Sequence, residues 1–280
     1  MKPHLMAVVF TGCVATLFAQ SAPPPVMQIT REAIKEGRGD AHRKVEQDYA
    51  NVFRRAKYSF NYIALSSSSG PSEVWFVTGF PSFAAVEQSD KESQKEPLKG
   101  ALALVEARDG ELRASSRVMT AVFRKDLSYM PENGVTFPKT RYVMIETFRV
   151  RMGHDDDFTS GGKMFMDAMQ KAKLSSPGFM YRVIAGAPEG TYLVFAPMAS
   201  LKEMDEEPAR QKAIMEAMGT ENFGRLMKSG GDVFQSIEAN WFGVSPEMSY
   251  VSKKTEDADP AFWRPKAAAT PKPKESGSSK

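Results

Sequence analysis

The chain has 280 residues, of which 42% are hydrophobic and 25% charged, a composition typical of a globular protein and not of a disordered or fibrous one. This length allows one large domain or two small ones. The formal net charge of +3 comes from the two ends of the chain, and the stretch between them is close to neutral. The charge distribution therefore excludes the broad basic surface that nucleic-acid binding requires, and no nucleic-acid partner is expected.

The first residues have the layout of a secretory signal peptide. Lys2 precedes an apolar run over residues 5–18, which is too short to span a bilayer comfortably, and small residues and prolines follow it. We predict a signal peptide over residues 1–19, cleaved after Ala19, and a short linker over residues 20–25. The mature protein is then exported, periplasmic or extracellular, and has no transmembrane segment. An uncleaved membrane anchor is the alternative.

Cys13 is the only cysteine and lies inside the apolar run. A lipoprotein anchored through Cys13 is the less favoured interpretation, because Phe10 is a poor first residue for a bacterial lipidation motif. If cleavage follows Ala19, the mature chain has neither a thiol nor a disulfide. The apolar core alone then has to hold the fold together.

The first half of the chain predicts the order strand, helix, strand, strand, helix, strand. Branched and apolar residues indicate strands, and apolar residues spaced by three and four indicate amphipathic helices. The predicted elements are a strand over 26–34, a helix over 40–57, strands over 60–65 and 74–80, a broken helical stretch over 83–105 and a strand over 117–124. This order is that of a ferredoxin-like βαββαβ module.

The second half repeats the order after a linker over residues 131–140, which contains Asn133-Gly134 and two prolines. Its predicted elements are a strand over 142–150, a helix over 158–173, strands over 179–184 and 191–196, a helical region over 201–228 and a strand over 238–244. Three sequence blocks match between the halves at offsets of 116 to 121 residues, among them FPSF at 80–83 and MASL at 198–201. The repeat indicates a duplication.

We therefore predict an α+β fold of two tandem ferredoxin-like modules, residues 26–130 and 141–252. A Pro-, Lys- and Ser-rich tail over residues 253–280 is predicted to be disordered, with Phe262-Trp263 as the pair that could attach its start to the body.

Both faces of the predicted strands are apolar. Trp75 and Val77 point to one face of their strand, and Val74 and Phe76 point to the other. An antiparallel sheet with one face in water would alternate apolar and polar residues. Helices should therefore cover one face of each sheet, and the other module's sheet should cover the second. This places the modules sheet to sheet, as a pseudo-dimeric α/β barrel within one chain.

The opening strand at residues 27–31, the Gly37/Gly39 turn and the strand–turn–helix segment at 77–83 with its second copy resemble the dimeric α/β-barrel superfamily. This superfamily includes antibiotic-biosynthesis monooxygenase-like and NIPSNAP-type proteins, and the resemblance covers roughly residues 26–250. It implies two modules that usually associate as a dimer and that are joined here in one chain; further self-association is left open. Because the superfamily contains oxygenases, heme-degrading enzymes and isomerases, the resemblance does not choose an activity.

Several aromatic and charged residues are candidates for binding a ligand, because aromatic side chains can line a pocket for a flat molecule and a charged group can orient it. The alternative is that they fill the core. The predicted ligand-binding residues are Arg31, Trp75, Glu146, Tyr181 and Trp241.

His42, Tyr62 and Trp75 are the candidates for catalysis. The ordinary pKa of histidine lies near 6.5, which suits a general base, but the sequence around His42 offers no evident orienting partner. The run His154-Asp155-Asp156-Asp157 is interpreted as a capped helix start, because the spacing of a calcium loop is absent. No metal site and no cofactor are predicted.

These observations predict an exported small-molecule-binding protein with an apolar, aromatic-lined cavity for a small apolar or aromatic molecule. Two alternatives stay open: a cofactor-independent monooxygenase-like enzyme, and a structural or interaction module without a ligand. A cavity above about 300 Å³ would favour the first two hypotheses over the third. Whether the protein is an enzyme is left undecided.

Overall fold

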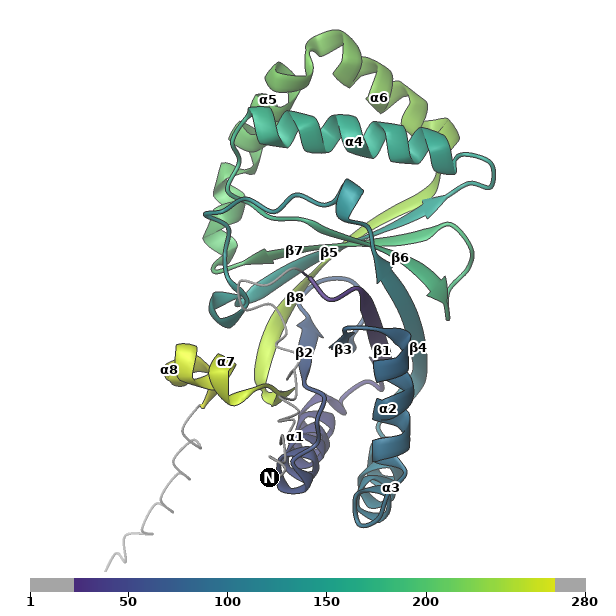
Figure 1. Ribbon diagram of the computed structural model, residues 1–280, viewed down its shortest axis with the longest axis vertical. Helices are drawn as coiled ribbons and strands as arrows, with labels where there is room; N and C mark the ends of the chain where they lie inside the picture. Colours follow the sequence, from purple (N-terminus) through teal and green to yellow (C-terminus); the bar gives the residue numbers. More distant parts are fainter. Residues whose placement is uncertain (1–22, 265–280) are drawn as a thin grey trace, which may run out of the picture.

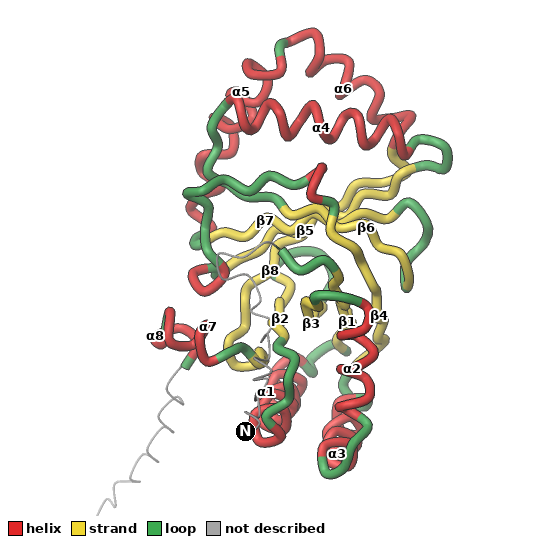
Figure 2. The backbone as a smooth tube through the Cα atoms, in the orientation of Figure 1, coloured by secondary structure: helices red, strands yellow, loops and turns green. Residues whose placement is uncertain are grey.

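The fold is a closed barrel of eight antiparallel strands with helices against its outside (Figure 1). The computed structural model describes residues 23–264, so the predicted signal peptide, Cys13 and the end of the predicted tail lie outside the described residues. Figure 2 shows the strands gathered in the middle, with one group of helices at each end of the molecule. The barrel predicted from the sequence is thus confirmed.

Each half of the chain follows the order strand, helix, strand, strand, helical segment, strand. The first half contains β1 (Val26–Ile34), α1 (Gly39–Ala56), β2 (Tyr62–Ser67), β3 (Glu73–Phe80), α2 (Phe83–Ser93), α3 (Leu98–Asp109) and β4 (Arg113–Phe123). The second contains β5 (Tyr142–Val150), α4 (Asp155–Lys171), β6 (Phe179–Ala185), β7 (Thr191–Met198), the 3-10 helix η3 (Leu201–Glu206), α5 (Glu207–Met218), α6 (Thr220–Val233) and β8 (Phe234–Tyr250). Two short 3-10 helices, η1 (Lys125–Leu127) and η2 (Phe137–Lys139), lie between the halves.

The helix starts have different physical causes. Ser82 caps α2, since its side chain accepts a hydrogen bond from the backbone N–H of Ala85. His154 occupies the cap position of α4 without a side-chain cap, and Asp155 to Asp157 follow in the first turn. These aspartates therefore lie at the start of the helix, as predicted, but they do not cap it. Their negative charges instead complement the positive end of the helix dipole.

The strand order around the barrel is β1-β3-β2-β8-β5-β7-β6-β4. Each half therefore contributes four consecutive strands, and the two sheets join at the β2·β8 and β4·β6 edges. Leu65 pairs with Val244 at the first of these seams, and Val122 pairs with Arg182 at the second. The expectation that the sheets merely stack face to face is corrected: their edges share backbone hydrogen bonds, which closes the ring.

The main core fills the inside of the barrel. Trp75 and Val77 belong to it, together with Ile29, Ile145 and Leu193 from other strands. Their alternate neighbours point outward, so that Val74 and Phe76 belong to a separate outer cluster. The sequence-based division of this strand into two apolar faces is confirmed, and the barrel interior is the place where both halves bury their inner faces.

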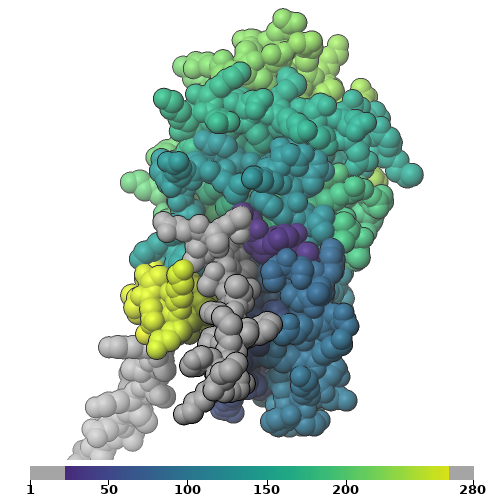
Figure 3. All heavy atoms as spheres, viewed as in Figure 1, coloured from purple at the N-terminus to yellow at the C-terminus, as the bar shows by residue number. Residues whose placement is uncertain are grey.

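Two short helices, α7 (Lys253–Ala258) and α8 (Pro260–Trp263), follow the barrel and lie at its side, coloured yellow in Figures 1 and 3. Trp263 is 3% exposed and belongs to the main core. The prediction of a disordered tail from residue 253 is therefore wrong up to residue 264, while the suggested attachment through Trp263 is confirmed. The cause is an aromatic pair in an otherwise polar segment, because Trp263 is buried in the core and Phe262 packs against it.

Within residues 23–264, no helix combines the length and the apolar composition that crossing a membrane would take.

Candidate functional site

An apolar cavity of about 320 Å³ opens at one end of the barrel. Strand residues form its inner wall, and the connection between the two halves, including Phe137, forms its outer wall. The strand side chains in the wall are Met27, Ile63, Leu65, Val77, Val143, Phe179, Tyr181, Phe195 and Pro197. The cavity is therefore built by both halves and is completed by the predicted linker.

Tyr181 is the tyrosine in the wall of this cavity. Its side chain is fully buried, and its hydroxyl donates a hydrogen bond of 3.1 Å to the carbonyl oxygen of Pro24. Burial raises the pKa of Tyr181, so the phenol stays neutral at physiological pH. Thr140, also in the wall, donates its hydroxyl to the carbonyl oxygen of Thr136. A ligand here would meet an apolar wall with few, already hydrogen-bonded polar groups.

A second, polar pocket of about 280 Å³ lies further along the same strands. Arg31 and Trp75 line it, as predicted for ligand-binding residues, but both are engaged with Glu73. Arg31 donates from Nε (2.7 Å) and Nη2 (2.9 Å), and the indole Nε1 of Trp75 donates at 2.9 Å. The guanidinium also lies 5.0 Å from the centre of the Trp75 ring. These three side chains form a closed set of contacts.

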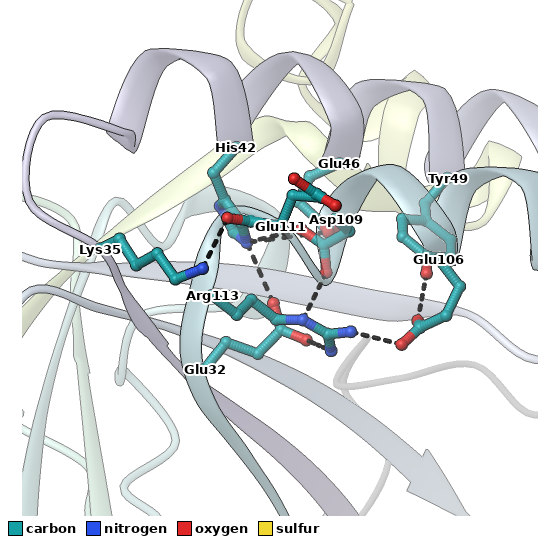
Figure 4. Close-up of polar contacts among 9 residues, drawn as sticks. All are labelled: Glu32, Lys35, His42, Glu46, Tyr49, Glu106, Asp109, Glu111 and Arg113. Carbon is teal, nitrogen blue, oxygen red and sulfur yellow. Dashed lines mark hydrogen bonds and ion pairs between the residues drawn. The ribbon is translucent and has the colours of Figure 1, made fainter.

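A buried polar cluster surrounds His42 outside the barrel, between the helices and the sheet (Figure 4). β1 alternates, so that Arg31 points into the barrel and Glu32 points out toward the helices. His42 and Glu46 are four residues apart on α1 and share one helix face. Asp109 is the last residue of α3, and Arg113 opens β4. The cluster is defined as Glu32, His42, Glu46, Asp109 and Arg113.

Four members of this cluster are buried almost completely, and the fifth, Arg113, has a side chain that is 13% exposed. The exposed fractions are 4% for Glu32, 1% for His42, 4% for Glu46 and 0% for Asp109. Three carboxyl groups thus share a buried site with one permanently charged partner, Arg113. Buried charges are tolerated only when they are paired or neutralised, so the cluster needs either protons or a further cation.

His42 Nε2 faces three carboxylate oxygens: Glu32 Oε2 at 3.0 Å, Asp109 Oδ1 at 3.4 Å and Glu46 Oε1 at 3.8 Å. Arg113 holds the other oxygens, with Nη1 at 2.7 Å from Glu32 Oε1 and Nε at 2.8 Å from Asp109 Oδ2. One oxygen of Glu32 and one of Asp109 are therefore directed at the imidazole.

The contacts of Arg113 continue toward the surface. Its guanidinium also pairs with Glu106, whose other oxygen accepts a hydrogen bond of 2.5 Å from the hydroxyl of Tyr49. Tyr49 lies on α1 and Glu106 on α3, so the outer end of the cluster joins the same two helices as its buried end.

The electrostatics of the cluster follow from its burial. Burial, with Glu32 and Asp109 nearby, raises the pKa of Glu46 to about 10. Burial and the charge of Glu32 raise the pKa of Asp109 to about 6, against the opposing effect of Arg113. Glu46 therefore holds a proton at neutral pH when no other cation is present.

The structure separates the three predicted catalytic residues. His42 lies in the buried cluster on α1, Trp75 lines the polar pocket inside the barrel, and Tyr62 lies under α1 against Phe53, with ring centres 5.8 Å apart. The hydroxyl of Tyr62 is buried without a hydrogen bond among the described residues, and burial raises its pKa. These three residues do not form one catalytic site.

The other predicted ligand-binding residues also lie in different places and do not form one site. Tyr181 lines the apolar cavity. Glu146 and Trp241 line neither pocket, because Ile145 and Phe242 next to them point into the barrel and alternation turns Glu146 and Trp241 outward. Burial, with Glu207 nearby, raises the pKa of Glu146.

Sequence reasoning missed the partners of His42. The proximity of Glu46 to His42 could have been predicted from the sequence, since residues four apart on a helix lie side by side. That of Glu32 and Asp109 could not, because they are 10 residues before and 67 residues after the histidine, and only the packing of α1 and α3 on β1 brings them there. The interpretation of His42 as a histidine without an orienting partner is wrong.

Comparisons with known proteins place the fold. No family profile and no curated protein matches the sequence. An anthrone oxidase-like protein matches with a TM-score of 0.52 and 11% identity over 79% of this chain and 91% of its own. A candidate monooxygenase from Fusobacterium nucleatum matches with a TM-score of 0.51 and 10% identity over 79% and 92% of the two chains.

A chlorite dismutase variant from Candidatus Nitrospira defluvii also matches, with a TM-score of 0.51 and 9% identity over 81% of this chain and 94% of its own. The fold of this chain is thus similar to that of these solved structures, as the resemblance to dimeric α/β-barrel proteins implies. The predicted resemblance is confirmed at this level, and identities near 10% carry it no further than the fold.

Proposed function

We propose that this is an exported small-molecule-binding protein whose ligand, a small apolar or aromatic molecule, occupies the cavity at one end of the barrel. The observation that carries the proposal is the cavity itself, whose volume of about 320 Å³ lies within the usual range for small-molecule sites, about 300–1,000 Å³. Export remains a prediction from the first 19 residues.

We also infer that the barrel arose by duplication of one ferredoxin-like module. The same order of strands and helices in both halves supports this origin, as does the contribution of four consecutive strands by each half. A ligand site at the junction would then be a site between two former subunits. Further self-association of the present chain stays a prediction.

The chemistry of the wall defines the ligand class. Apolar side chains such as Val77, Val143 and Phe195 would contact the surface of the ligand. The binding free energy would come from removing apolar area from water. The Tyr181 hydroxyl donates to Pro24 but can still accept one hydrogen bond. A flat ligand with a single donor group fits this arrangement.

The fold neighbours support a cofactor-independent monooxygenase-like enzyme as the alternative, because they include an anthrone oxidase-like protein and a candidate monooxygenase. General acid–base catalysis needs a titratable group poised beside the substrate. In the described part of the cavity wall, the titratable side chains are Tyr181, which is kept neutral, and Glu132, which is exposed at the edge. Binding without catalysis is therefore the preferred proposal.

The test uses the mature chain, residues 20–280, and the fluorescent apolar dye N-phenyl-1-naphthylamine. Saturable binding of one dye per chain is expected. Val143→Trp places a large ring in the wall and should weaken binding at least tenfold. Val118→Trp makes the same change on the outer face of β4, where the side chain is 53% exposed, and should leave binding unchanged.

Binding that does not saturate, or that is equal in the two tryptophan variants, would contradict the proposal, provided that circular dichroism shows both variants folded. Oxygen uptake with anthrone that is lost in Val143→Trp would favour the enzyme. Native mass spectrometry of the protein from its own host would identify a co-purified ligand.

A further inference from the structure

The cluster around His42 is independent of the cavity, because it lies on the outer face of the sheet and shares none of the residues that line the cavity. Four of its members each offer one ligand atom, and these atoms all lie within 4.8 Å of one another. We propose that Glu32, His42, Glu46 and Asp109 bind one divalent transition-metal ion, which fastens α1 and α3 to β1. This proposal departs from the sequence-based expectation that the protein has no metal site.

Asp109 provides an observation beyond the grouping of acidic residues. Both of its carboxylate oxygens are buried and accept no hydrogen bond within residues 23–264, although Arg113 Nε lies 2.8 Å from Oδ2. Its Oδ1 is directed into the cluster at 3.4 Å from His42 Nε2, and the side chain is 1% exposed. A buried carboxylate oxygen without a hydrogen bond is costly, and a metal ion at this position would satisfy it.

The carboxylate oxygens around the imidazole of His42 also outnumber the hydrogen-bond donors that it can offer. Three carboxylate oxygens lie 3.0 to 3.8 Å from His42 Nε2, and a single N–H can donate to only one of them. An ion placed between Nε2 and these oxygens would serve all three at once. His42 would then bind it as a neutral imidazole, which is the usual form of a metal-ligating histidine.

Arg113 orients the two carboxylates for this role. It takes Oε1 of Glu32 and Oδ2 of Asp109, and so leaves Oε2 and Oδ1 facing the histidine. Partners of this kind, which hold a ligand by its other atom, are typical of metal sites. Arg113 thus contacts the carboxylates that would bind the ion and does not occupy the position of the ion itself.

The size of the site suits a small ion. Ligand atoms about 2.0–2.2 Å from one metal lie at most about 4.4 Å apart, so the widest pair allowed by the limit of 4.8 Å would have to contract by at least a few tenths of an ångström. One nitrogen and three oxygens favour Zn²⁺ or Mn²⁺, because Ca²⁺ and Mg²⁺ take oxygen ligands.

The test uses the mature chain, unfolded in urea with a chelator and refolded with Zn²⁺, Mn²⁺ or Ca²⁺ or without metal, because the site is buried. After desalting, one Zn²⁺ or Mn²⁺ per chain is expected by plasma mass spectrometry, and little Ca²⁺. At a hundredfold excess over Kd, the melting temperature should rise by about 5–10 °C and fall again with EDTA.

Two single variants of α1 make the comparison specific. Glu46→Gln keeps the shape of a neutral Glu46 and should weaken metal binding at least tenfold. Asp48→Asn also removes one carboxylate, but its side chain is 48% exposed and pairs with Arg108 outside the cluster, so binding should persist. His42→Gln is the second ligand variant, in case Glu46→Gln fails to fold.

Absence of stoichiometric metal in the refolded wild-type chain would overturn the proposal. Equal metal binding by the ligand variants and Asp48→Asn would also overturn it, since the ion would then lie elsewhere. Because the dye experiment concerns only the cavity, its failure would leave this result unaffected.

Discussion

The indole nitrogen of Trp263 donates a hydrogen bond of 3.0 Å to the carbonyl oxygen of Pro138. This contact joins the segment after the barrel to the connection between the two halves. Trp263 also packs against Phe137, with ring centres 5.6 Å apart, and Phe137 forms part of the cavity wall. The C-terminal helices therefore support the wall from outside.

Trp263→Ala should lower the free energy of unfolding by about 3–5 kcal/mol, because it empties a large space in the core and removes one of the two hydrogen bonds that the Pro138 carbonyl accepts, the other coming from Arg141. Urea denaturation measures the loss. Leu104→Ala, at a side chain 74% exposed, is the control and should have little effect. If both variants unfold alike, α8 does not contribute to the core. The dye should also bind Trp263→Ala more weakly than the wild type.

Glu73→Gln should lower the free energy of unfolding by about 1.5–3 kcal/mol, since Glu73 accepts hydrogen bonds from Arg31 and from Trp75 at a largely buried position. Thermal and urea unfolding both report the change. Glu189→Gln disrupts the exposed pair with Arg182 and should cost less than about 1 kcal/mol. If Glu73→Gln and Glu189→Gln lose the same free energy of unfolding, burial in the polar pocket does not strengthen the contacts of Glu73.

The stability of Glu146→Gln should exceed that of the wild type at neutral pH. Burial, with Glu207 nearby, raises the pKa of Glu146 above its ordinary value of 4.5, so the folded protein binds this proton more tightly than the unfolded chain. The contribution of Glu146 to the stability of the folded protein is fully present at pH values below the ordinary pKa. It is lost as the pH rises through the raised pKa of the folded protein.

The advantage of the glutamine variant should therefore disappear below a pH of about 4.5, where Glu146 is protonated in both states. Urea denaturation across a pH series measures it. Glu216→Gln, at an exposed residue of α5, should show no such pH dependence. A constant difference between Glu146→Gln and the wild type at all pH values would contradict the assignment to Glu146.

Much of the fold could be predicted from local signals. The alternation of Trp75 and Val77 with Val74 and Phe76 indicates a strand covered on both faces, and the structure places one face in the barrel and the other outside it. The matched blocks in the two halves predicted the same order of elements twice. What the alternation could not show was edge pairing, because side-chain direction carries no information about which backbone edges meet.

The candidate site was less predictable. Tyr181 was selected because an aromatic residue with a hydroxyl suits a pocket, and it lines the cavity. The cluster around His42 joins β1, α1, α3 and β4, and only the folded arrangement brings its carboxylates together. Glu146 and Trp241 were selected as strand residues of the right type, but a shift of one position turns a side chain to the opposite face.

The two seams of the barrel have a consequence for how the protein loses its structure. Because β2 depends on β8 and β4 depends on β6 for their outer hydrogen bonds, neither half can open without exposing strand edges of the other. The halves are thus thermodynamically interdependent and should melt in one cooperative transition. A fragment that held only one of them would have two unpaired borders and an uncovered apolar face, and would associate with another copy of itself.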